Sequence, residues 1–153
     1  NYNLVTIPTD IVMIGSLPAG VSRNTPTVNM PLGSGGFLPW LQQCAASVSN
    51  PGNRGNRKTV SLGESWALGL PSYSLGNVLL PPNPKYPNCN NSTGSGNAVN
   101  KPGVYTLSSR HPGGANVLMC DGSVRFLKDS TNMQTVWALG SRAQGEIISA
   151  DAF

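Results

Sequence analysis

Charged side chains are scarce in this chain of 153 residues: they make up 10% of it, with ten Lys and Arg against six Asp and Glu. So few charges exclude a polypeptide kept disordered by self-repulsion and leave a surface made polar by amides and hydroxyls. The net charge of +4 is modest. Its densest part, residues 54–58, lacks the interleaved aromatic residues of a nucleic-acid-binding surface. We therefore expect no nucleic-acid partner.

Long apolar runs are also missing. The longest, residues 11–14, falls far short of the roughly 18 apolar residues of a membrane-spanning helix, so we expect no membrane span in this chain. The sequence begins without an initiator Met or a signal peptide, which leads us to expect a processed, truncated or partly observed form. Its polar, loop-rich composition suits an extracellular or cell-surface location.

Turn-forming residues are correspondingly abundant: Gly, Pro, Ser and Asn together make up 64 of the 153 residues. This composition argues against a helical bundle and favours short strands joined by long loops. The length fits one domain. We therefore predict a single α+β domain over residues 1–153, with an antiparallel β-sheet, short helices and long loops rich in Gly, Pro and Asn.

Several elements can be placed in the first half of the chain. β-Branched residues between helix breakers predict short strands over 3–7 and 10–14. A short helix is predicted to follow Pro39 and to reach about Ala46, because proline is tolerated at a helix start and apolar residues then share one face. Residues 59–69 alternate like a strand, although Gly63 weakens that pattern.

The most informative segment is a predicted hairpin of residues 116–120 and 123–127, joined by Asp121 and Gly122. Asp-Gly favours a two-residue type I′ turn, because that turn needs positive φ angles. Such a turn pairs position 120 with 123 and position 117 with 126. This register predicts a core face made of four apolar side chains: Val117, Met119, Val124 and Phe126.

A helix and a strand are predicted after the hairpin. Asp129 or Ser130 would cap a helix over about 131–139, and Gly140 would end it. Trp137 belongs to the apolar stripe of this helix and is predicted to be core. Residues 145–149 have the composition of a final strand.

The sequence offers little for catalysis or metal binding. General acid–base work by His111, the single histidine, would need a partner within about 3 Å of its imidazole. Residues 63–67 are a near miss for the nucleophile elbow G-x-S-x-G, and they lack its parallel-sheet context. No Cys, His or acid spacing matches a zinc or calcium site. We therefore predict no enzyme activity, no catalytic residue, no metal and no cofactor.

Three cysteines are present. Cys44 lies near the end of the predicted helix and Cys89 in a loop, where a crosslink would anchor otherwise unsupported chain. Cys120 lies in a predicted strand, where a small thiol packs much like alanine. We predict a Cys44–Cys89 disulfide with Cys120 free. The alternative is three reduced thiols in a cytosolic protein.

Residues 109–126 combine a histidine, nine intervening residues and an Asp-Gly pair, at His111, Asp121 and Gly122. This segment resembles the prepilin-type processing-associated H-x9-DG domain. That domain ends a large planctomycete family of unknown function, which is also placed among bacterial solute-binding proteins. The resemblance covers residues 108–153, and a weaker one extends over 37–107. The family gives the three motif residues no settled role.

Members of that family begin with a prepilin leader and a long apolar helix of pilin type. The resemblance therefore implies that this chain is the globular C-terminal part of a pseudopilin-like precursor, a pilin-like domain without its N-terminal helix. It also implies two kinds of partner, namely further copies of the chain and a separate chain that carries the missing helix.

These observations lead us to expect a non-catalytic structural subunit of an extracellular pilus-like filament, tube or surface assembly. Low charge limits repulsion between stacked copies, and loop tyrosines would supply contact area. The tyrosines expected there are Tyr73, Tyr86 and Tyr105. The alternative is a secreted or periplasmic module that binds a solute or carbohydrate in a cleft rimmed by Trp40 or Trp66.

Overall fold

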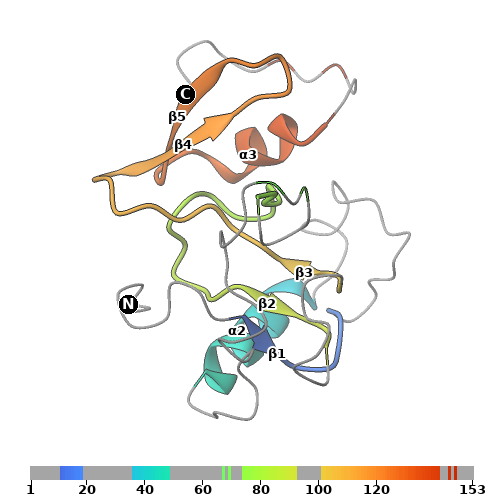
Figure 1. Cartoon of the computed structure of the whole chain (residues 1–153). Helices are drawn as coiled ribbons and strands as arrows, with labels where there is room; N and C mark the ends of the chain where they lie inside the picture. Colours follow the sequence, from blue (N-terminus) through green and yellow to red (C-terminus); the bar gives the residue numbers. More distant parts are fainter. Residues whose placement is uncertain are drawn as a thin grey trace. The chain divides into compact units, whose positions relative to one another are not determined.

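A computed structural model of the chain describes residues 11–18, 36–48, 67, 69, 74–92, 101–141, 145 and 147. These residues contain helices α2 and α3 and the short strands β1 to β5 (Figure 1). The pairing between strands is mostly antiparallel. The predicted α+β class with an antiparallel sheet, short helices and long loops is therefore confirmed.

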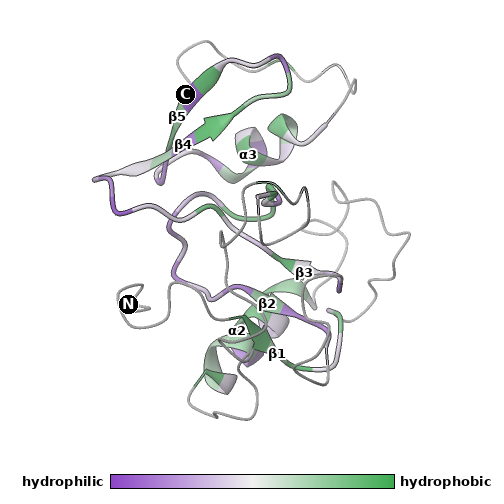
Figure 2. Cartoon of the chain, viewed as in Figure 1, coloured by the Kyte–Doolittle hydropathy of each residue, from purple (hydrophilic) through white to green (hydrophobic). Residues whose placement is uncertain are grey.

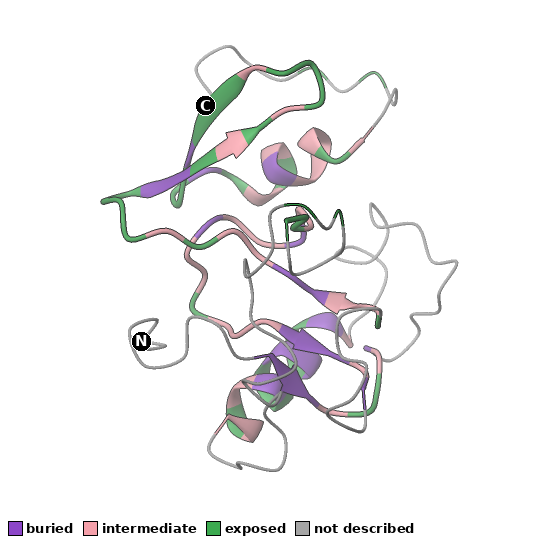
Figure 3. Cartoon of the chain, viewed as in Figure 1, coloured by how far each residue is buried: buried purple, intermediate pink, exposed green. Residues whose placement is uncertain are grey.

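The chain divides into two compact units. The N-terminal unit consists of residues 1–76 and 85–105, and the C-terminal unit of residues 77–84 and 106–153. Each unit has its own buried apolar residues, which Figure 3 shows in purple. The single domain over residues 1–153 stays a prediction.

A small sheet lies in the N-terminal unit, in the order β1-β2-β3. β1 (Val12–Met13) runs parallel to β2 (Cys89–Asn90), which runs antiparallel to β3 (Gly103–Val104). Cys89 stands between the outer strands, opposite a valine on each, and all three side chains are almost completely buried. The sheet is therefore the centre of this unit's core, although each strand has two residues.

Helix α2 (Phe37–Ser47) packs against β1. Its buried residues, Phe37, Trp40, Leu41 and Cys44, recur at helical spacing and form one face. Pro39 is the third helical residue, where its missing N–H costs no hydrogen bond because the first-turn N–H groups have no partner within a helix. The predicted helix is confirmed, and it begins two residues before Pro39.

The C-terminal unit is built on a hairpin of β4 (Gly114–Leu118) and β5 (Val124–Lys128). α3 (Met133–Leu139) follows it. Ala115 and Leu127 face each other across the hairpin and are both 4% exposed. They define an inner face, which lies on the buried side of the sheet.

Helix α3 begins later than its sequence suggests. Asn132 caps it, because the Asn132 side chain accepts a hydrogen bond from the backbone N–H of Gln134 at 2.8 Å. The predicted caps, Asp129 and Ser130, lie instead in a turn that follows β5. Trp137 is only half-buried, and its indole N–H donates to the carbonyl of Leu79 at 3.2 Å.

The register of the hairpin differs by one residue from the prediction. Leu118 lies opposite Val124, and Val117 lies opposite Arg125. The side chains of β4 keep their expected grouping, whereas every side chain of β5 changes face. The predicted core face is therefore wrong: Val124 and Phe126 lie on the opposite side of the hairpin from Val117.

Some predicted strands lie outside the described residues. These are the whole of 3–7, most of 59–69, and 145–149 apart from Gly145 and Ile147. Within the described part of the chain, no helix has both the length and the apolar character needed to cross a membrane.

Candidate functional site

The β4–β5 hairpin carries the H-x9-DG segment and is the candidate site. Its histidine and its Asp-Gly pair lie at opposite ends of β4: His111 precedes the strand, and Asp121 lies in the loop beyond it. A five-residue strand spans about 13 Å between its end residues at about 3.3 Å per residue. His111 and Asp121 therefore do not form an acid–base pair.

The Asp-Gly pair belongs to a three-residue loop, 120–122, rather than to a two-residue turn. Met119 and Ser123 close the loop, with the Met119 N–H donating to the Ser123 carbonyl at 2.8 Å. Gly122 has a φ of 85°, whereas Asp121 does not have a positive φ. A type I′ turn needs positive φ at both central residues, so this backbone adopts the three-residue loop that ends in a left-handed glycine.

The exposed carboxylate of Asp121 stabilises this loop by a hydrogen bond to its backbone. Its Oδ1 accepts a hydrogen bond from the backbone N–H of Ser123 at 2.8 Å, in the manner of an Asx turn. That hydrogen bond holds the pKa of the fully exposed Asp121 carboxyl below its ordinary value of 3.8. Asp121 and Gly122 therefore set the register of the hairpin.

The segment that leads into β4 is held by hydrogen bonds from backbone N–H groups to side-chain and backbone oxygens. The exposed His111 donates its backbone N–H to Ser109 Oγ at 3.1 Å. Asn83 Oδ1 accepts the N–H of Ser109 at 2.8 Å, and the N–H of Asn83 donates to the carbonyl of Leu107 at 3.0 Å. These contacts position the chain before the hairpin.

The observed register creates an apolar outer face on the hairpin. This outer face consists of three cross-strand pairs, namely Gly114 with Lys128, Asn116 with Phe126, and Leu118 with Val124. Leu118 is 73% exposed, Val124 64% and Phe126 41%. The ends of the two strands nearest the loop are coloured as hydrophobic in Figure 2 and mostly as exposed in Figure 3.

At the end of the outer face farthest from the loop, the Phe126 ring covers the backbone of Gly114. A Cβ added to Gly114 would lie 2.9 Å from Cε1 of the Phe126 ring and would overlap the carbonyl oxygen of Leu127. The ring therefore lies over the backbone of Gly114, which is buried although it has no side chain. This packing fixes the position of Phe126 and requires glycine at position 114.

Sequence reasoning missed this outer face because it assigned the wrong loop length. The useful signal was the residue before Asp-Gly: Cys120-Asp121-Gly122 also fits a three-residue loop with glycine at its last position. The same finding corrects the position of Cys120. The Cys120 thiol is free and exposed in the loop, not packed within a strand.

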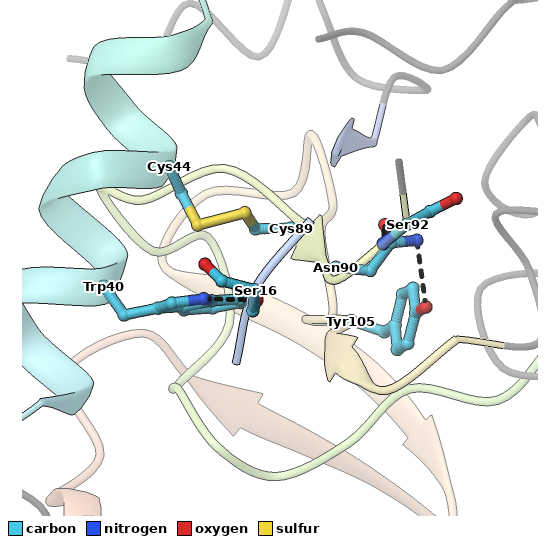
Figure 4. The surroundings of a disulfide bond; sticks show 7 residues. All are labelled: Ser16, Trp40, Cys44, Cys89, Asn90, Ser92 and Tyr105. Carbon is cyan, nitrogen blue, oxygen red and sulfur yellow. Dashed lines mark hydrogen bonds between the residues drawn. A yellow bond between two sulfur atoms is a disulfide. The ribbon is translucent and has the colours of Figure 1, made fainter. Parts of the chain in front are cut away.

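The predicted disulfide is confirmed in the N-terminal unit. Cys44 on α2 and Cys89 on β2 are bonded, with 6.1 Å between their Cα atoms, and both residues are fully buried. Figure 4 shows the bond crossing from the helix to the strand. It joins the buried face of the helix to the central strand of the sheet.

The candidate ligand aromatics do not form a described cleft. Trp40 is 4% exposed, and its indole N–H donates to the carbonyl of Ser16 at 2.8 Å (Figure 4). Its ring is therefore part of the core and presents almost no surface to a solute. Trp66 lies outside the described residues.

The loop tyrosines differ in their surroundings. Tyr105 is 4% exposed, which corrects the expectation that it lies on a contact surface. Its hydroxyl donates to the carbonyl of Lys101 and accepts from Asn90 Nδ2 at 3.3 Å, and burial raises the pKa of the phenol. Tyr86 is half-buried, with the Lys85 ammonium 5.4 Å from its ring centre. Tyr73 lies outside the described residues.

Among the described residues, no three His, Cys, Asp or Glu side chains gather where they could hold a metal ion. The described residues form two features that bear on function. One is a crosslinked, hydrogen-bonded core in the N-terminal unit. The other is a rigid hairpin with an exposed apolar face in the C-terminal unit.

Comparison with known proteins adds a family. Searches of the curated proteins and of the solved structures found no match. A model of a family described as "Protein of unknown function (DUF1559)" matches residues 18–134. The match covers most of the chain, including α2, strands β2 to β5 and the start of α3. The chain therefore belongs to the DUF1559 family.

Proposed function

We propose that this chain is a non-catalytic structural subunit of an extracellular assembly, such as a pilus-like filament, tube or surface layer. The observation that carries the proposal is the apolar outer face of the hairpin. Leu118, Val124 and Phe126 form one continuous row across two strands and are all exposed. A contiguous exposed apolar patch of a few hundred Å² is often the functional surface of a folded domain.

The chemistry of the remaining chain supports the same proposal. The Cys44–Cys89 disulfide is typical of proteins from oxidising compartments, as an extracellular subunit would be. With charged residues at 10% of the chain, copies of this protein repel one another little. Membership of DUF1559 agrees with the resemblance to a planctomycete family with a prepilin-type N-terminus and an H-x9-DG domain.

On this proposal the H-x9-DG segment has a structural task. Asp121 and Gly122 fix a loop that places β5 one residue away from the register of a two-residue turn. Without that shift, Val124 and Phe126 would turn toward the inner face. The motif's Asp-Gly pair therefore maintains the surface through which the subunit would assemble.

Electron microscopy of the oxidised chain at increasing concentration tests the proposal. We expect filaments, tubes or sheets with a regular repeat, because a subunit with a built contact surface adds in a fixed geometry. Discrete monomers at every concentration would contradict it, as would turnover of a substrate that depends on described residues.

A further inference from the structure

We propose that the outer face of the β4–β5 hairpin packs against the same face of a second copy of this chain, with a two-fold axis relating the copies. This inference rests on the proposed assembly function and names the surface that would serve it. It follows from the area of the outer face, its charge and its hydrogen-bonding groups.

The area of the outer face suits a contact that is weak alone. Leu118, Val124 and Phe126 are 73, 64 and 41% exposed, which amounts to roughly 300 Å² of apolar side-chain surface. Two such faces would bury about 600 Å² from these side chains, below the 1,200 Å² or more of a stable interface. A single contact should therefore be weak, and repetition in an assembly would strengthen it.

The charge of the outer face favours a copy of itself over a charged partner. Lys128 is its one charged residue, at the end farthest from the loop. The other five residues offer no field that would steer an oppositely charged protein. A two-fold axis that runs perpendicular to the strands and passes beside Asn116 places the two Lys128 side chains at opposite ends of the contact, so that no like charges meet.

The hydrogen-bonding groups of the outer face are self-complementary as well. Asn116 is exposed beside Phe126, and its amide both donates and accepts hydrogen bonds. Across a two-fold axis each amide can therefore pair with its counterpart in the second copy. A face that carried only donors or only acceptors could not satisfy itself in this way.

The outer face is also preorganised in the single chain. The hydrogen-bonded loop fixes the strand register, and the packing of Phe126 over Gly114 fixes the ring. Ordering side chains at an interface opposes association, so a preset ring and backbone reduce that cost.

The test compares two lysine variants by sedimentation velocity between about 10 µM and 1 mM, the range in which a weak contact forms. Leu118→Lys with Val124→Lys places two positive charges in the centre of the outer face. Leu38→Lys with Leu75→Lys is the matched control, because both leucines are 53% exposed in the N-terminal unit and the variant adds the same two charges. We expect the unmodified chain and the control to associate alike, and the double variant to associate at least about tenfold more weakly.

A charge-pairing experiment tests the two-fold arrangement. Asn116→Lys and Asn116→Asp should each weaken association, whereas an equimolar mixture should recover it because position 116 lies at the axis and opposite charges then meet across it. Recovery supports contact between two copies. Two impaired variants that show no recovery would overturn the two-fold arrangement.

A measurement on the unmodified chain makes the inference independent of whether a variant folds. Dilution from about 1 mM should shift the amide NMR signals of the outer-face residues, while those of α2 stay constant. Shifts confined to other surfaces would overturn the inference. So would an unmodified chain that remains monomeric throughout, a result expected if a different protein occupies this face.

The outcomes separate this inference from the proposed function. Regular assemblies that persist in the Leu118→Lys and Val124→Lys double variant would refute the outer-face contact and leave the structural function standing. Dimers that form through the outer face but never grow into a repeating structure would support the contact and refute the assembly function.

Discussion

The Cys44–Cys89 disulfide should contribute a large part of the stability of the N-terminal unit. The bond closes a loop with a sequence separation of 45 residues. In the chain-entropy model, a crosslink of this span removes about 13 cal/mol/K from the entropy of the unfolded chain, or about 4 kcal/mol at 25 °C. We therefore expect reduction to lower the free energy of unfolding by about 4 kcal/mol.

Urea denaturation of the oxidised and reduced chains measures this difference. Cys44 and Cys89 are fully buried, so reductant must be added in denaturant and retained during refolding. Comparing oxidised with reduced protein changes no packed side chain except by two hydrogen atoms, and so isolates the covalent constraint. The reduced chain should also show a larger dependence of unfolding free energy on urea, because its unfolded state exposes more surface.

Cys120 provides the control. Its thiol is exposed and free, so Cys120→Ala should leave the free energy of unfolding of the oxidised chain within about 0.5 kcal/mol. A loss below about 1 kcal/mol on reduction would refute the reasoning. It would mean that the loop between the cysteines is already compact in the unfolded chain.

Three further predictions concern single residues. Gly114→Ala should destabilise the C-terminal unit by about 1–3 kcal/mol in thermal or urea denaturation, because its Cβ would overlap the carbonyl oxygen of Leu127; an unchanged stability would contradict the close approach. Tyr105→Phe should cost about 1–3 kcal/mol by removing a hydrogen bond from the buried Asn90 amide, and in the unmodified chain the absorbance titration of this phenol should have its midpoint above 10.0. The carboxyl of Asp121 should titrate with a pKa below 3.8 when followed by NMR. The stabilising effect of this carboxylate is present above pH 3.8 and is lost as the pH falls through the lowered pKa. Protection of the Ser123 N–H from hydrogen exchange should therefore decline in that range.

The sequence predicted the features that depend on local chemistry. Helix α2 followed from apolar spacing and from the tolerance of its first turn for Pro39, and the hairpin followed from two β-rich segments around an Asp-Gly pair. The disulfide could be predicted because Cys44 and Cys89 belonged to segments that needed an anchor. In each case the residues themselves carry the physical reason for the structure.

Features that depend on a competition between similar local structures could not be predicted. Asp-Gly is compatible with a two-residue and with a three-residue loop, which differ in the φ of Asp121 and in whether Cys120 belongs to the strand or to the loop. That difference moved Val124 and Phe126 from an expected core to an exposed face. The helical spacing of Trp40 with the other buried residues of α2 was a signal for its burial, whereas its hydrogen bond to Ser16 gave none because it joins positions 24 residues apart.

The exposed outer face has few charged residues that would oppose association with another protein. Protein surfaces commonly discourage unwanted association by carrying charged residues among exposed apolar ones. Here Lys128 lies at one end, whereas Leu118 and Val124 beside the loop have no charged neighbour on the same face. The inner face shows that the hairpin tolerates a charge near its loop, because Arg125 is exposed there. Near the loop, the hairpin therefore carries a charge on its inner face and none on its outer face. The uncharged outer face can pack against a second copy, as the proposed contact requires.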